Sequence, residues 1–244
     1  MKKFLTLLAM AASLLAVSCN KNNEEEEEEQ KQEEAKGLGI KIDGNFDDWA
    51  ALKPEYVASA KNDPNSPWEA VKEIRCCADK DFVYYYIKYG KSDLDDLLSE
   101  AAEELPIRLC INTDGEFTTG YESYFLDAYD FIVEGGLAEG GSFTAYDGNF
   151  YQRVDGSWNK LLSEGSNLVL GAGSGNEYEI LLAREIFNNA VPSDQKMGDI
   201  FHTGIRFYTD GAGSWAELSN MPNASVETGD GNGWGHLMEV KTVK

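Results

Sequence analysis

Short segments of β-type sequence recur about every ten residues along this chain, and turns rich in Gly, Asp and Asn separate them. The strongest segment, residues 82–89, is apolar or aromatic at nearly every position, which is typical of a central strand covered on both sides. Only residues 92–105 show a convincing helical period. Because parallel strands need helical crossovers, the pattern predicts an all-β fold: an antiparallel two-sheet β-sandwich of immunoglobulin or jelly-roll type with one short amphipathic helix.

The other predicted elements follow from alternation and turn residues. Asp147-Gly148-Asn149 is a tight-turn signal, which predicts a hairpin between residues 142–146 and 151–154. Pro192 limits residues 183–188 to about one helical turn. Further strands are predicted at residues 40–42, 70–78, 107–111, 129–133, 168–170, 177–182, 205–209, 215–218 and 237–243.

The N-terminus has the pattern of an export signal. Lys2 and Lys3 precede an apolar run over residues 4–17 that is too short to span a bilayer comfortably. The run ends in small residues before Cys19, which resembles the lipobox of bacterial lipoproteins and implies that Cys19 is acylated. The alternative is an ordinary signal peptide with a chance cysteine. The chain is therefore divided into a signal peptide (1–18), a lipidated Cys with an acidic tether (19–36) and one folded domain (37–244).

The tether contains six consecutive glutamates at residues 24–29 and has no aromatic residue with which to build a core. Such a run after the lipid cysteine resembles the surface-export signal of Bacteroidetes lipoproteins, although a simple repelling spacer has the same composition. We expect an outer-membrane protein that is exposed at the cell surface, or otherwise at the periplasmic face. Its contact with the membrane is expected only through the lipid on Cys19.

The net charge of the chain limits the classes of binding partner that we expect. The chain has 21 basic and 43 acidic residues, a formal net charge of −22. Phosphate recognition depends on clusters of Lys and Arg, so nucleic acid and anionic lipid are not expected partners. Divalent cations and neutral ligands are compatible with this charge.

Nothing in the sequence predicts a nucleophilic enzyme. The two histidines, His202 and His236, lie in separate segments, and the Gly-rich stretch at residues 171–175 lacks the spacing of a nucleophile elbow or a dinucleotide-binding fingerprint. A hydrolase with paired carboxylates is the enzymatic alternative that composition leaves open. We expect a protein without catalytic residues.

Three cysteines remain after Cys19, namely Cys76, Cys77 and Cys110. They form no Cys-x-x-Cys motif, so a zinc or thioredoxin-like site is not favoured. In an exported protein, Cys110 could form one disulfide with either neighbour. Equally, the adjacent strand cysteines could be small buried hydrophobic residues.

Carboxylates flank two predicted strands between residues 105 and 136. The oxygen-bearing side chains are Asn112, Asp114, Glu116, Asp127, Asp130 and Glu134. Their spacing is not that of an EF-hand, but they supply the hard ligands that calcium prefers. Asn112, Asp114, Asp130 and Glu134 are the predicted metal ligands. The alternative is structural ion pairing across the sheet, with Arg108 as the cation.

Tryptophans beside loops are the predicted ligand-binding residues, because a sugar ring stacks on a flat exposed aromatic side chain. Four of them have this setting: Trp68, Trp158, Trp215 and Trp234. Each could instead pack at the rim of the fold. Trp49 follows an Asp-Gly turn and precedes an apolar step, which favours a role in the core.

The ordered motifs resemble the carbohydrate-binding module family 9-like sandwich, which is related to DOMON domains. The resemblance covers nearly all of residues 40–243 and rests on Ile42-Asp43-Gly44 with Asp47-Asp48-Trp49, residues 79–87, Ile111-Asn112-Thr113-Asp114 with Gly120-Tyr121, residues 127–135, residues 178–186, and Trp234-Gly235. It implies a two-sheet β-sandwich, often with structural calcium, and a sugar held between aromatic side chains. By position, Asn112, Asp114 and Asp130 match the family's aspartate-rich segment, with Asn112 where the family often has Asp.

DOMON relatives can bind haem through Met and His. This chain has Met197, Met221, His202, His236 and Met238, but no spacing marks an axial pair, so no haem is expected. The function that the resemblance implies is non-catalytic binding of a glycan by a membrane-anchored surface lipoprotein. The alternative is an adhesin-like or assembly module of the same fold that binds a protein partner.

Overall fold

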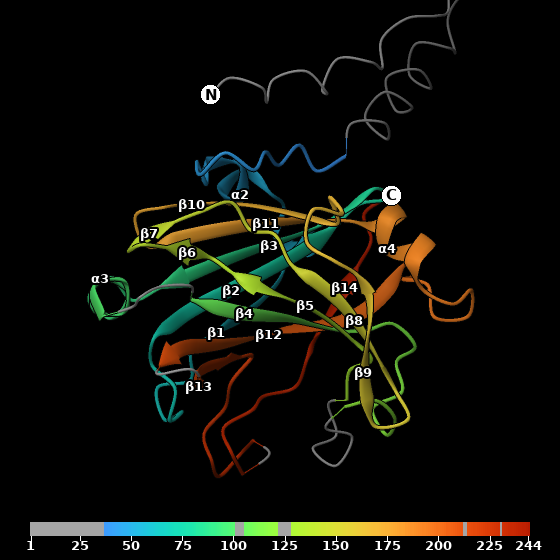
Figure 1. Ribbon diagram of the computed structural model, residues 1–244. Coiled ribbons are helices and arrows are strands. Elements are labelled where there is room, and N and C mark those ends of the chain that lie inside the picture. The colour runs from blue at the N-terminus through green and yellow to red at the C-terminus, as the bar shows by residue number, and fades with distance from the viewer. Residues whose placement is uncertain (1–36, 101–104, 122–127, 212–213, 230) are drawn as a thin grey trace, which may run out of the picture. The chain divides into compact units, whose positions relative to one another are not determined.

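A computed structural model describes residues 37–100, 105–121, 128–211, 214–229 and 231–244. Residues 37–244 form one compact unit, in which two antiparallel sheets face each other (Figure 1). The predicted two-sheet sandwich is therefore confirmed. The signal peptide, Cys19 and the acidic tether lie outside the described residues.

The first sheet has five strands in the order β1-β2-β3-β11-β10. Their bounds are β1 (Ala58–Lys61), β2 (Val71–Ala78), β3 (Phe82–Tyr89), β10 (Val169–Ser174) and β11 (Glu177–Ala183). The central strand β3 has the bounds predicted from its sequence. The strands predicted at residues 168–170 and 177–182 are β10 and β11, which pair as a hairpin, and β10 extends to Ser174.

The second sheet has seven strands. Six follow the order β13-β12-β4-β5-β8-β9, and β14 pairs with β12 beyond the end of β13. The bounds are β4 (Pro106–Asn112), β5 (Phe131–Gly136), β8 (Asn149–Val154), β9 (Ser157–Leu162), β12 (Ile200–Gly211), β13 (Ser214–Met221) and β14 (Met238–Lys241). A short pair, β6 (Ala138–Glu139) and β7 (Ser142–Phe143), stands apart from both sheets.

Helices lie at the margins of the sandwich. Besides a 3₁₀ turn at Pro54–Tyr56, they are α2 (Asp47–Ala51), α3 (Lys91–Glu100) and α4 (Arg184–Ala190). Figure 1 shows α3 and α4 at opposite ends of the sandwich and α2 over β10 and β11. The predicted amphipathic helix is thus α3 as far as Glu100, and residues 101–104 lie outside the described residues. Among the described residues, none of the helices is long and apolar enough to cross a membrane.

Strand β3 is covered on both faces, as its sequence predicted. Val83, Tyr85 and Ile87 are buried in the main core between the sheets. Tyr84 and Tyr86 point to the opposite face, where residues 37–52, which we call the N-terminal segment, pack over them. The N-terminal segment therefore shields the aromatic side chains on this face from solvent. Its packing on the sheet creates the concave surface described below.

Two sequence predictions about local structure are wrong. Residues 40–42 form no strand; Ile40 instead packs against the outer face of the first sheet. The predicted hairpin between residues 142–146 and 151–154 does not form, because β7 pairs with β6 while β8 pairs with β5 and β9. Alternation alone does not tell a strand from an extended segment that covers a sheet.

The cysteines are free thiols buried in the fold, which selects the second of the two predicted roles. Cys76 lies in the core between the sheets, Cys77 under the N-terminal segment and Cys110 on the outer face of the second sheet. Burial raises the pKa of the Cys76 and Cys77 thiols, so they remain protonated at neutral pH. These three side chains act as small hydrophobic residues.

Candidate functional site

A cleft of about 520 Å³ lies on the outer face of the five-stranded sheet. One wall is the N-terminal segment from Gly44 to Ala50, and the opposite wall is the β10–β11 turn from Ser174 to Glu177. The floor is formed by Arg75, Tyr86 and Lys88 of β2 and β3. This size lies within the range typical of sites for small molecules.

Strand register explains why these floor residues meet. Arg75 and Tyr86 are direct cross-strand partners, and so are Lys88 and Glu177. The alternation of a strand puts residues i and i+2 on the same face, so Tyr86 and Lys88 both point outward from β3. Three adjacent strands therefore present one continuous set of polar side chains.

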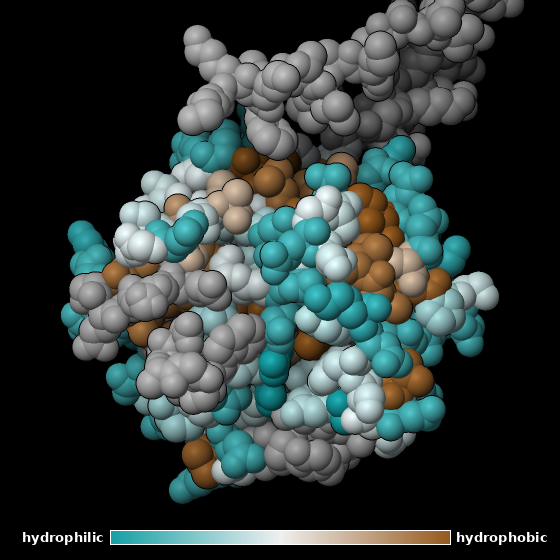
Figure 2. Space-filling model, in the orientation of Figure 1, coloured by the Kyte–Doolittle hydropathy of each residue, from teal (hydrophilic) through white to brown (hydrophobic). Residues whose placement is uncertain are grey.

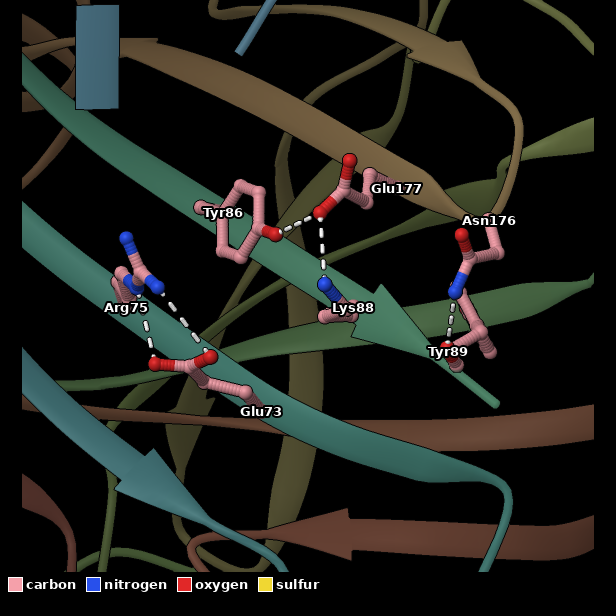
Figure 3. A network of polar contacts seen from close by, with 7 residues as sticks. All are labelled: Glu73, Arg75, Tyr86, Lys88, Tyr89, Asn176 and Glu177. Atoms are coloured by element: carbon pink, nitrogen blue, oxygen red, sulfur yellow. Dashed lines mark hydrogen bonds and ion pairs between the residues drawn. The ribbon is translucent and has the colours of Figure 1, made fainter. Parts of the chain in front are cut away.

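Two cations in the cleft are each paired with a carboxylate (Figure 3). Arg75 Nε donates to Glu73 Oε1 at 2.9 Å and Arg75 Nη2 to Glu73 Oε2 at 3.3 Å. Lys88 Nζ donates to Glu177 Oε1 at 3.2 Å, and the Tyr86 hydroxyl donates to the same oxygen. The cleft is thus rich in charged groups, yet these two pairs are neutral overall.

The carboxylate of Glu177 is held in its ionised form. Burial raises the pKa of Glu177, but the hydrogen bonds from Tyr86 and Lys88 and the positive charges of Lys88 and Arg75 outweigh burial and lower it. A glycosidase needs one carboxyl group that stays protonated to act as a general acid. Glu177 does not meet that requirement.

Aromatic rings line the same cleft. The guanidinium carbon of Arg75 lies 4.9 Å from the Tyr86 ring centroid, and Phe46 and Trp49 contact the same ring at centroid distances of 5.7 and 5.6 Å. Tyr86 and Trp49 are almost fully buried, whereas Phe46 is only half-buried. Phe46 is therefore the aromatic wall residue that a ligand can reach.

Glu179 holds the N-terminal segment in place. Its side chain is fully buried, and Oε1 accepts hydrogen bonds from the backbone N–H groups of Asp43 and Gly44 at 2.9 and 2.8 Å. Oε2 accepts a third hydrogen bond, from the Trp49 indole. One carboxylate thus fixes the wall that carries Phe46.

Three hydrogen bonds do not fully offset the removal of Glu179 from water. Burial raises its pKa, and the negative charge of Asp43 adds to this effect, while the bonds from Gly44, Asp43 and Trp49 act against it. The wall is therefore held by a carboxylate that is costly to keep ionised.

The four tryptophans predicted to bind a ligand are not gathered at this cleft. Trp234 is only 7% exposed, and the Arg206 guanidinium carbon lies 4.3 Å from its ring centroid, so it lacks the exposed face that a sugar platform needs. Trp68 is half-buried beside the loop that contains Gly233. Trp158 is half-buried on β9. The backbone of Trp215 pairs with Asp210, but its side chain lies outside the described residues.

The predicted metal ligands divide into two groups. Glu134 forms an ion pair with its cross-strand partner Arg108, 2.5 Å from Nε to Oε2, as the ion-pairing alternative required. Asn112 is fully buried, and its amide bonds the backbone of Glu116, Ala128 and Gly115. Asp114 and Asp130 lie near enough to repel each other. Asp127 lies outside the described residues, and in the described part no group of three or more His, Cys, Asp or Glu side chains is placed to hold a metal ion.

The sequence of β3 indicates part of the cleft, but strand periodicity alone does not identify the other segments that complete it. Strand alternation places Phe82, Tyr84, Tyr86 and Lys88 on one face of β3, and Tyr86 and Lys88 form part of the floor of the cleft. The partners that complete the site come from residues 44–50 and from the β10–β11 turn, far away in the chain. No local pattern joins these segments.

Comparisons with known proteins do not identify the chain. No model of a known protein family matches it. No curated protein matches it either.

Proposed function

We propose that the cleft on the five-stranded sheet binds a neutral oligosaccharide and that the protein is a non-catalytic glycan-binding lipoprotein. The observation that carries this proposal is the combination of charge-paired polar groups with the half-buried ring of Phe46. Sugar hydroxyls both donate and accept hydrogen bonds, and a guanidinium–carboxylate pair offers both partners side by side. The ring of Phe46 adds an apolar surface for the C–H groups of a pyranose.

The pairing of charges favours a neutral ligand over a charged one. An anion would have to compete with Glu73 for Arg75 and with Glu177 for Lys88. A cation would face the same competition in reverse. A neutral polyol can join both pairs without separating them, so less electrostatic energy is lost on binding.

The anchoring part of the proposal rests on the sequence. Acylation at Cys19 would tether the domain to the outer membrane, and the run of glutamates would keep the tether extended by self-repulsion. Structural calcium at Asp114 and Asp130 remains a further hypothesis that the family resemblance suggests.

The protein-binding alternative has less support. A stable docking surface for a protein usually includes a contiguous apolar patch. On the face shown in Figure 2, hydrophobic residues form one group at the upper right and otherwise lie scattered among hydrophilic ones. Among the described residues, the large exposed hydrophobic side chains are Val154, Leu170, Ile200 and Val226, and they belong to separate elements or loops.

Calorimetric titration with a panel of neutral oligosaccharides tests the proposal. We expect Phe46→Ala to weaken binding about fivefold, because stacking of one aromatic ring contributes about 1 kcal/mol. Leu170→Ala is the matched control, since Leu170 is exposed on β10 and does not line the cleft. Equal losses in both variants, or silence across the panel with and without calcium, would refute the proposal. Turnover of the bound glycan would show an enzyme instead.

A further inference from the structure

The hairpin of β8 and β9 carries an unusual set of side chains on the outer face of the seven-stranded sheet. Arg153 is the direct cross-strand partner of Trp158, and Tyr151 is the partner of Lys160. Residues two apart on a strand share a face, so these four side chains form one surface, which we call the hairpin face. It alternates cations with aromatic rings.

The contacts within the hairpin face are between cations and rings. The Arg153 guanidinium carbon lies 5.3 Å from the Trp158 ring centroid and 5.0 Å from that of the neighbouring Tyr121. Lys160 Nζ lies 5.4 Å from the Tyr151 ring centroid and donates a hydrogen bond to the Asn149 side chain at 2.7 Å. Cations over rings are stabilised by the π electrons but keep their positive charge unneutralised.

The two cations of the hairpin face differ from several others in this chain, because no described acidic residue pairs with them. Arg75, Arg108 and Arg206 each lie within 4.0 Å of a glutamate oxygen. By contrast, no described carboxylate lies within ion-pair distance of Arg153 or Lys160, even though acidic residues outnumber basic ones twofold. Asp130 is close in the backbone, since its carbonyl accepts a hydrogen bond from Arg153 N, yet the Arg153 side chain packs on Trp158.

We propose that the hairpin face is a second binding surface, for a saccharide that carries a carboxylate, such as a uronic acid. Arg153 offers a planar fork of donors that matches a carboxylate, and Lys160 adds a second positive charge. The exposed parts of the half-buried Trp158 and Tyr121 side chains add apolar area beside these cations. Acidic residues lie nearby, since Glu164 accepts a hydrogen bond of 2.9 Å from the same Asn149 side chain, but no described carboxylate is within ion-pair distance of either cation.

This surface is independent of the cleft in both position and chemistry. It lies on the other sheet, and its cations have no carboxylate to release before they meet a ligand. The ring of Trp158 is held in place, because it stacks on buried Tyr129 with an interplanar angle of 23°. Little side-chain entropy would be lost when a ligand binds to a ring held in this way.

Calorimetric titration of the full chain with a galacturonate trimer and with the matching galactose trimer tests this proposal. We expect the galacturonate trimer to bind to the wild-type hairpin face at least about tenfold more tightly than the galactose trimer does. Its affinity should fall as the salt concentration is raised from about 50 to about 300 mM, because salt screens contacts with exposed cations. The double variant Arg153→Gln/Lys160→Gln should lose at least tenfold in affinity for galacturonate. Lys241→Gln is the control, because Lys241 is exposed on β14 beside Glu239.

The two sites can be separated in the same experiment. Phe46→Ala in the cleft should leave galacturonate binding unchanged, so failure of the cleft proposal does not affect this one. The proposal is overturned if galacturonate does not bind at millimolar concentration or if the double variant binds it as well as wild type does. It is also overturned if a glutamate pentapeptide binds as tightly as galacturonate, because charge alone would then explain the affinity.

Discussion

The Trp49 indole donates a hydrogen bond of 3.2 Å to Glu179 Oε2, across 130 positions in the chain. Trp49 is 3% exposed and Glu179 is fully buried, so water does not replace this contact. The same carboxylate accepts the backbone N–H groups of Asp43 and Gly44. This relationship links the first turn of the domain to the centre of the five-stranded sheet and positions one wall of the cleft.

Glu179→Gln should loosen this wall while preserving the size of the side chain. The amide nitrogen of Gln cannot accept a hydrogen bond, so one of the buried donors loses its partner at a cost of about 1 to 3 kcal/mol. We expect a lower free energy of unfolding in urea and weaker binding of the neutral oligosaccharide. Glu55→Gln is the control, because Glu55 lies on the exposed 3₁₀ turn. Unchanged glycan affinity in a destabilised Glu179→Gln would mean that the wall does not form the site.

The pH dependence of stability should reveal Asp130. Burial and then the like charge of Asp114 raise its pKa from 3.8 to about 6. Between these values the folded state holds a proton that the unfolded state has released, so the contribution of Asp130 to stability falls as pH rises from 4 to 6. At neutral pH its charge costs about 1 to 2 kcal/mol once screening by solvent is considered.

Asp130→Asn should therefore raise the free energy of unfolding at pH 7 in the presence of a chelator, and this gain should vanish below about pH 4. Thermal unfolding at several pH values measures the effect. The same variant tests the calcium hypothesis. If millimolar calcium stabilises the wild-type protein and not Asp130→Asn, then Asp130 is a ligand. A stabilising effect that is the same at pH 4 and pH 7 would contradict the electrostatic explanation.

Sequence patterns predicted the β-sandwich well, because a strand that is buried on both faces has apolar residues at nearly every position. Strand β3 is the clearest case, since an apolar residue at nearly every position requires cover on both faces. The ion pair of Arg108 with Glu134 was also foreseen as an alternative, because alternation places both on one face of adjacent strands.

The candidate site was harder to predict because its parts meet only through tertiary packing. A tryptophan beside Gly-rich turns resembles an exposed platform, yet loops fold back and bury Trp234 under Arg206. The role of Phe46 depends on its contact with Tyr86, forty positions away in the chain. A local sequence pattern can predict that a residue is buried, but it does not predict which distant segment of the chain covers that residue.

The buried thiols give a further prediction. Cys76, Cys77 and Cys110 are inaccessible in the folded protein, and burial raises the pKa of the first two, so reactive thiolate is scarce. Ellman's reagent should not label them in native buffer and should label all three in guanidinium. A reducing agent should leave the melting temperature unchanged. A drop in melting temperature upon reduction would show a disulfide instead.

Arg184 should be the most sensitive cation for stability. It is 6% exposed, and its guanidinium donates to the carbonyl oxygens of Asp79, Met197 and Gly198 and to the Thr242 hydroxyl. Burial lowers its pKa, and nearby aspartates partly offset this effect. One side chain thus ties the β2–β3 turn to the C-terminal end of the domain.

Lysine cannot replace this arrangement, because its single ammonium group cannot span acceptors that lie on both sides of a planar fork. We expect Arg184→Lys to lower the free energy of unfolding by about 2 to 4 kcal/mol in urea titrations, since buried carbonyl groups lose their donors. Lys80→Arg, at an exposed position of the same turn, should change it by less than about 0.5 kcal/mol. Binding at the cleft and at the hairpin face should persist in Arg184→Lys at temperatures below its unfolding transition, because neither surface contacts Arg184. Loss of binding without loss of stability would contradict a purely structural role.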